Sequence, residues 1–214
     1  NVGSKVLMAT TLIKTITSSN AASVSFADGT SSVVLDNTYK LYRFTFVDIN
    51  PATDNVYFQF QSNAAGASGY NEESINTVVS TSHNESGTDA TEDDYASGSD
   101  QINDSATSEG PALGTGFLNL AMGVGNGGDE SCAGELFLFD PSNTTFVTQW
   151  LSRFNTYRND NYTQEVRTSG CFNITAAVDE IQFKMSSGNF DGTISLWGVC
   201  LLYTSDAADD LLCV

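Results

Sequence analysis

Basic residues are scarce in this sequence. Eight Lys and Arg stand against 26 Asp and Glu in 214 residues, which gives a formal net charge of −18, and no Lys or Arg lies between Arg43 and Arg153. Binding to a phosphate backbone or an anionic membrane surface needs clustered basic residues. The composition therefore argues against nucleic acid and membranes as partners, and the charge itself favours solubility.

Long apolar runs are also missing. No stretch of about 18 apolar residues occurs, so the sequence predicts no membrane helix. The first residue, Asn1, is not followed by a basic and then apolar leader, so no signal peptide is predicted.

The residues on which most enzymes rely are few. His83 is the single histidine, and Gly128-Asp129-Glu130-Ser131-Cys132 lacks the closing glycine of a nucleophile elbow. Carboxylate pairs arise anywhere in so acidic a chain, and sequence does not set their separation. We therefore expect a protein without catalytic activity.

Four cysteines occur, at positions 132, 171, 200 and 213, and none forms a CxxC pair. One histidine cannot complete a zinc site with them at any usual spacing. Two alternatives remain for Cys132 and Cys171: a disulfide in an oxidising compartment, or two buried thiols in neighbouring strands.

What the sequence does contain is alternating apolar and polar residues. Tyr42, Phe44 and Phe46 alternate with polar neighbours, as do Val56, Phe58 and Phe60, and a turn-forming segment at 50–55 separates the two runs. This pattern predicts two half-buried strands joined as a hairpin.

The same pattern recurs along the chain. Strands are predicted at 6–17, 22–26, 75–83, 117–122, 135–140, 144–157 and 164–175, and a second hairpin at 181–185 and 193–199. We expect Phe146, Trp150 and Phe154 to share one face of the 144–157 strand and Trp197 to lie in the core. The sequence thus predicts a single all-β domain over residues 1–199: an antiparallel β-sandwich, jelly-roll-like, of about eleven strands with no substantial helix.

Residues 84–116 form an acidic excursion that has no basic residue and few apolar ones. Hard oxygen donors suit calcium, although no group here has the spacing of a dedicated calcium loop. A plain acidic loop and a calcium site are therefore both open, and no other cofactor is expected. The calcium candidates are Asp89, Glu92, Asp93, Asp94, Asp100 and Asp104.

Tyrosines in predicted loops are the candidate ligand contacts. Tyr70 and Tyr95 lie outside the predicted strands, and an exposed aromatic ring stacks on sugars or anchors a protein interface.

Several segments together resemble a known family. Residues 37–44 (NTYKLYRF), 49–61 (INPATDNVYFQFQ), 129–150 and 171–199 resemble, in order and wording, structural proteins of marine tailed bacteriophages described as virion or tail-fibre-like. The resemblance spans residues 6–199 and brings no catalytic motif. It implies a virion component that contacts other virion proteins and host glycans, and by analogy with fibre proteins a homo-oligomer, expected to be a trimer.

The last residues differ from the rest of the chain. Residues 200–214 (CLLYTSDAADDLLCV) resemble a translated sequencing adapter, so we interpret them as a non-native tail. The alternative is an amphipathic tail whose leucines pack on the sandwich.

Two functions follow from these observations. The first is a structural or attachment component of a phage virion, such as a tail-fibre or capsid-surface protein, made in the host bacterial cytoplasm. The second is a free carbohydrate-binding, lectin-like module, calcium-dependent if the acidic excursion binds the ion.

Overall fold

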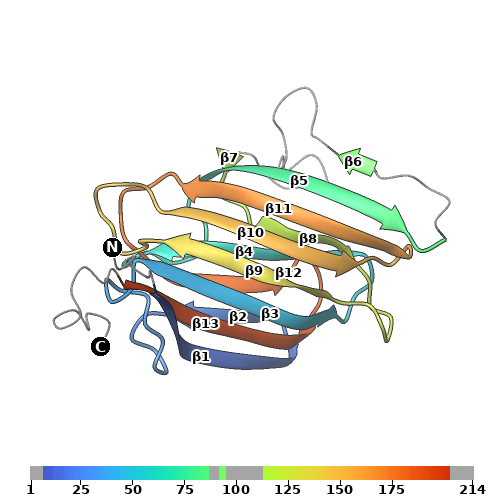
Figure 1. Ribbon diagram of the computed structural model, residues 1–214, viewed down its shortest axis with the longest axis horizontal. Coiled ribbons are helices and arrows are strands. Elements are labelled where there is room, and N and C mark those ends of the chain that lie inside the picture. Colours follow the sequence, from blue (N-terminus) through green and yellow to red (C-terminus); the bar gives the residue numbers. More distant parts are fainter. Residues whose placement is uncertain (1–6, 87–91, 95–112, 203–214) are drawn as a thin grey trace, which may run out of the picture.

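The computed structural model describes residues 7–86, 92–94 and 113–202, and within these ranges every regular element is a β-strand (Figure 1). Eleven strands have five residues or more, and two are shorter, which confirms the predicted all-β class. The strands are β1 (Leu7–Ala21), β2 (Ser23–Ala27), β3 (Leu41–Pro51), β4 (Val56–Ala64), β5 (Ser74–Asn84), β6 (Glu92–Asp94), β7 (Leu113–Gly114), β8 (Leu118–Val124), β9 (Cys132–Phe139), β10 (Gln149–Tyr157), β11 (Tyr162–Phe172), β12 (Val178–Met185) and β13 (Phe190–Leu202).

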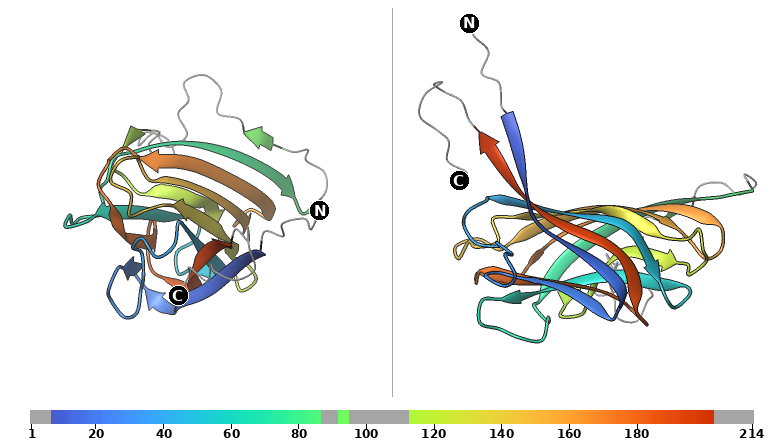
Figure 2. Two further views of the ribbon diagram at one scale, coloured as in Figure 1. Left: turned by 60° about the vertical axis from the view of Figure 1, so that its left-hand side comes forward. Right: turned by 90° about the horizontal axis from the view of Figure 1, so that it is seen from below.

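The strands form two antiparallel sheets that pack as a sandwich (Figure 2). One sheet has the order β1-β13-β3-β9-β10-β11-β5-β6, with β7 also paired to β5, and the other has the order β2-β12-β4-β8. The chain changes sheet at every step from β1 to β5, and again between β7 and β8, β8 and β9, β11 and β12, and β12 and β13. This nested alternation is a jelly roll, whose first sheet is extended by β10, β11 and β5.

Both predicted hairpins are wrong in their pairing. β3 pairs with β13 and β9, whereas β4 pairs with β12 and β8; likewise β12 and β13 lie in different sheets. The predicted strands exist, but the turns between them lead from one sheet to the other. Alternation reports that one face of a strand is buried and is silent about which strand lies beside it.

Aromatic rings fill the space between the sheets. The Phe183 ring lies between 4.9 and 6.5 Å, centroid to centroid, from five other phenylalanine rings of both sheets. All six side chains are fully or almost fully buried. Ile181 and Met185, on the same side of β12 as Phe183, are buried as well. The five neighbouring rings belong to Phe26, Phe44, Phe46, Phe58 and Phe60.

The extension of the first sheet has a much smaller core. Val78, Met122 and Val166 form a separate buried cluster against which Tyr57 packs. The main core reaches β10 and β11 through Trp150, Phe154 and Phe172, but many other inward side chains here are polar, and Ser152 and Thr168 hydrogen-bond to each other across β10 and β11. The edge of the molecule at β5 is thus held by less apolar contact than the centre.

Two expectations for single aromatic residues are also wrong. Phe146 lies before β10 and is 71% exposed, so it does not share the face of Trp150 and Phe154. Trp197 points to the solvent side of β13 and is only partly buried, because β13 buries Ile194 and Leu196 instead.

β13 continues to Leu202 and pairs there with the start of β1. The first three residues of the predicted tail 200–214 thus belong to β13, and the rest of the tail, from residue 203, lies outside the described residues. Among those that are described, no helix is long and apolar enough to span a membrane.

Candidate interaction surface

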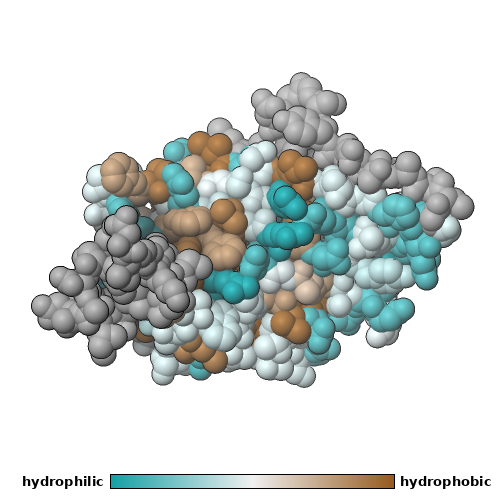
Figure 3. All heavy atoms as spheres, in the orientation of Figure 1, coloured by the Kyte–Doolittle hydropathy of each residue, from teal (hydrophilic) through white to brown (hydrophobic). Residues whose placement is uncertain are grey.

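The solvent-facing side of the nine-stranded sheet, hereafter the outer face, carries the exposed apolar residues of the described chain (Figure 3). Seven large apolar side chains are at least 38% exposed, and six of them belong to strands of this sheet. They are concentrated on one sheet face, in several patches that polar side chains separate (Figure 3). The six are Leu12, Val47, Ile75, Val79, Phe139 and Leu151.

Strand register arranges the outer face in straight rows. Residues paired across neighbouring strands point to the same side of a sheet, so each row can be followed through the ladder from β1 to β5. The first row is Leu12, Trp197, Arg43, Phe137, Leu151, Ser169 and Thr77, and the second is Thr15, Ser195, Thr45, Glu135, Arg153, Arg167 and Val79.

Charged side chains lie in the middle of these rows. Arg43 pairs with Glu135 at 2.8 Å. Arg153 and Arg167 both donate to Glu165, Arg167 at 3.0 Å. Three of the eight basic residues of an acidic chain therefore gather on one face. Exposed ion pairs of this kind stabilise a monomer little, so their place here favours a role in contact.

The two arginines set the charge of Glu165. Burial would raise the pKa of this carboxyl, but the hydrogen bonds from Arg153 and Arg167 outweigh it and hold the pKa below its ordinary value. Glu165 is therefore ionised at neutral pH, and it keeps both guanidinium groups on the outer face.

Beside this network lies an aromatic and cationic ridge. The Arg43 guanidinium sits 5.8 Å from the centroid of the Phe137 ring, and the Trp197 indole Nε1 donates to the Thr45 hydroxyl at 3.1 Å. Arg and aromatic residues are enriched at the energetic centres of protein interfaces.

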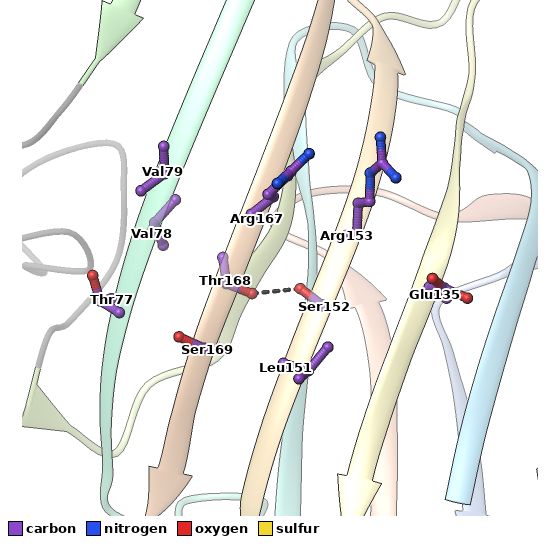
Figure 4. A pocket seen from close by; sticks show the side chains of 10 residues that line it. All are labelled: Thr77, Val78, Val79, Glu135, Leu151, Ser152, Arg153, Arg167, Thr168 and Ser169. Atoms are coloured by element: carbon purple, nitrogen blue, oxygen red, sulfur yellow. Dashed lines mark hydrogen bonds between the residues drawn. The ribbon is translucent and has the colours of Figure 1, made fainter. Parts of the chain in front are cut away.

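Two shallow hollows lie on the outer face, and Figure 4 shows the side chains that line one of them. One, of about 520 Å³, lies over β10, β11 and β5 between Leu151, Val79, Arg153 and Arg167, and Ser169 and Thr77 line its floor. A second, of about 470 Å³, adjoins it at Glu135 and Arg153. The large side chains of Trp197, Arg43 and Phe137 thus lie on one half of the outer face, and the larger hollow lies mainly over the other half.

The opposite face of the molecule differs. Outward side chains of the four-stranded sheet are polar and bond to one another, as Gln59 does with Asn119 at 2.7 Å. Lys184 covers the Phe117 ring at 4.1 Å, and Gln61 is fully buried under the backbone of residues 72 and 116. The polar side chains of this face thus already bond to groups of the same chain.

Tyr70, a predicted ligand contact, lies on that polar face. Its hydroxyl donates to the Glu180 carboxylate and contacts the Ser25 hydroxyl at 3.0 Å, and its backbone N–H donates to Asn63 at 2.7 Å. Burial, and then the bond to Glu180, raise the pKa of Tyr70 to about 12. The structure places Tyr70 in an internal hydrogen-bond network.

The other predicted binding residues fall mostly outside the description. Glu92, Asp93 and Asp94 form β6, whose backbone pairs with Ser80–Ser82 of β5. Tyr95, Asp89, Asp100 and Asp104 lie outside the described residues. Within the described part of the chain no group of three or more His, Cys, Asp and Glu could hold a metal ion.

A disulfide between Cys132 and Cys171 is not formed, and both thiols are free. Cys132 pairs with Thr156 and Cys171 with Gln149, at opposite ends of β10. Cys132 is buried, and burial raises the pKa of its thiol well above the ordinary value, whereas Cys171 is partly exposed on the outer face. The thiols are separate, but the alternative of two buried thiols in neighbouring strands is also wrong, because only Cys132 is buried and β10 lies between β9 and β11.

His83 is exposed on β5, where its ring nitrogen Nδ1 lies 2.8 Å from the carbonyl oxygen of Asn84. Ser82, its neighbour in sequence, is buried on the other side of the strand. The Ser-His proximity that the sequence offers is therefore not a nucleophile and base in contact.

Sequence reasoning missed the outer face. Alternation in each strand did identify outward residues such as Arg153 and Leu151, but it gave no order of strands. Only the register brings Arg43, Glu135, Arg153 and Arg167 together from four strands.

Comparisons with protein-family models, with curated proteins and with solved structures gave no match.

Proposed function

We propose that this chain is a non-enzymatic structural or attachment component of a phage virion that works by binding protein. The observation that carries the proposal is the outer face, on which apolar and arginine side chains are gathered although the chain has a net charge of −18. The sequence resemblance to phage structural proteins supports the proposal independently. Jelly rolls are common in viral capsid and lectin domains, which supports it by analogy only.

Such a component binds other virion proteins through the outer face and forms a homo-oligomer. The outer face suits this role because it combines arginine, aromatic and exposed aliphatic side chains, and arginine and aromatic residues are enriched in protein interfaces. It is also broad and only shallowly hollowed, as a protein contact surface is.

A carbohydrate-binding module is the second candidate. The hollow of about 520 Å³ supports it, because two guanidinium groups and several hydroxyls line a depression next to apolar side chains, which suits an acidic sugar. If binding depended on calcium, a chelator would abolish it, whereas a contact between virion proteins would persist.

Size-exclusion chromatography with light scattering, combined with a glycan panel tested with and without calcium, separates the two. The virion component is expected to be a stable oligomer without glycan affinity. A stable monomer that binds glycans would contradict the proposal and support the module.

A further inference from the structure

We propose that the outer face binds the same face of a second copy of this chain, across a two-fold axis that runs along the strands between β9 and β10. This inference rests on the proposed function, for which it names the partner. It follows from the distribution of side-chain size and charge over the two rows of the outer face.

A half-turn about that axis lays each strand on a defined partner. β9 of one copy faces β10 of the second, β3 faces β11, and β13 faces β5, and residues stay level with their own row. Twisted sheets that pack face to face keep their strands within about 30° of each other, so the correspondence is closest for the strands nearest the axis.

The first row is self-complementary in size under this operation. Its β13, β3 and β9 members are large and form the ridge of Trp197, Arg43 and Phe137. Its β10, β11 and β5 members are smaller and border the hollow of about 520 Å³. The half-turn places the ridge of each copy over the hollow of the other, and Phe137 then faces Leu151, Arg43 faces Ser169 and Trp197 faces Thr77.

The second row is also complementary in size, but here the small side chains lie on β3 and β13 and the large ones on β11 and β5. Thr45 and Ser195 are its small members on β3 and β13, and they face the long side chains of Arg167 and Val79. Next to the axis, Glu135 of each copy faces Arg153 of the other. Opposite charges therefore meet twice across the interface, and no like charges meet in these two rows.

Charge selects the outer face over the remaining surface for self-association. Two chains of net charge −18 repel each other. The two rows and the adjoining Glu165 together contain three arginines and two glutamates. Two copies that meet through this face therefore bring no excess of negative charge together. Six strands and about four rows span on the order of 800 Å², the area that each partner buries in a standard interface.

A steric variant tests the interface directly. Ser169→Trp fills the hollow that receives Arg43 of the second copy, without touching the monomer core, because Ser169 is exposed. Ser23→Trp, at an exposed serine on β2 of the other sheet, is the matched control. In sedimentation velocity we expect wild type and Ser23→Trp to be dimers, and Ser169→Trp to dissociate at least about tenfold more readily.

A charge exchange tests the two-fold geometry. Glu135→Arg and Arg153→Glu each place like charges opposite one another across the axis and are expected to weaken the dimer. The double variant restores opposite charges across the axis but leaves Arg43 and Glu165 beside like charges within each copy, so it is expected to recover part of the affinity that the single variants lose. Thermal unfolding of each variant at a concentration where all are monomeric provides the control for folding. A double variant no tighter than the single variants would overturn the two-fold arrangement.

The outcomes distinguish the inference from the proposed function. A wild-type oligomer that Ser169→Trp leaves intact, or a trimer, would overturn the inference alone. A wild-type monomer that binds glycans would overturn both.

Discussion

At the scale of single residues, the hydroxyl of Tyr70 is the most sharply constrained group outside the core. The residue adopts a left-handed backbone conformation at φ 49°, and its hydroxyl is held by Glu180. A non-glycine residue in this conformation persists when its surroundings determine it. Tyr70 therefore closes the loop between β4 and β5 over the polar face of the four-stranded sheet.

The raised pKa of Tyr70 predicts a pH dependence at high pH. Folding favours the protonated phenol, so its contribution to stability is complete below the ordinary tyrosine pKa of 10.0 and is lost as pH rises through the folded-state pKa of about 12. We expect Tyr70→Phe to lower the free energy of unfolding at pH 8 by about 0.5–1.5 kcal/mol. The deficit should shrink between pH 10 and 12, as measured by urea unfolding. A deficit constant across that range would show that Tyr70 titrates normally in the folded state.

Gly134 in β9 is required by close packing. A Cβ at this position would lie 2.3 Å from the carbonyl oxygen of Arg153 and 2.6 Å from the Phe154 ring. Gly134→Ala is therefore expected to destabilise the fold by about 1–3 kcal/mol through overpacking. Gly128→Ala, where the added Cβ would meet nothing within 4 Å, is the control and should change stability by less than about 0.5 kcal/mol. Equal unfolding midpoints for the two variants would contradict this packing.

The two tryptophans show how far single residues can be predicted. Trp150 is buried at 2% exposure among inward residues of β10, as expected from alternation with Leu151 and Arg153. Trp197 alternates in phase with Ser195 and Thr193, so the pattern placed it outward, and only its size argued for the core. The pattern was the better guide, because strand geometry fixes the face that a side chain takes.

At the scale of elements, the strands were predictable and their partners were not. The turns after β3 and β12 contain the residues that favour reversal, and Asn55, Gly188 and Gly192 have positive φ. A reversal can join neighbours within one sheet or lead from one sheet to the other, and local sequence favours both equally. Partner choice depends on contacts between residues far apart in the chain, as between β1 and β13.

The central strand β12 predicts a large effect of one core substitution. The Phe183 ring contacts phenylalanine rings from both sheets. Phe183→Ala is expected to cost about 3–5 kcal/mol, and Phe183→Leu clearly less, in chemical denaturation. A cost below about 1 kcal/mol for Phe183→Ala would mean that the two sheets do not pack through this cluster.

The extension of the nine-stranded sheet predicts uneven amide exchange. β5 is supported by the small cluster of Val78, Met122 and Val166, whereas β3 lies over the main aromatic core. Local opening needs less free energy where fewer apolar contacts are lost. We expect amides of β5 to exchange with deuterium faster than those of β3, measured by mass spectrometry on the wild type. Equal protection of β3 and β5 would contradict this difference.

At the scale of the whole molecule, composition predicted a strongly acidic protein, and the structure shows on which face basic residues are nevertheless gathered. Arg43, Arg153 and Arg167 come from separate segments, and the jelly roll with its extension brings them onto one sheet face. Net charge could be read from the sequence, whereas its asymmetry depends on strand order. Pairing of two copies through the outer face is accordingly the proposal to test first.

Sedimentation equilibrium of the wild-type chain over a range of micromolar concentrations provides that test. Each chain has a mass of 22.8 kDa. Pairing through the outer face predicts a species of twice this mass that dissociates on dilution. A single species of one chain's mass at every concentration would contradict it.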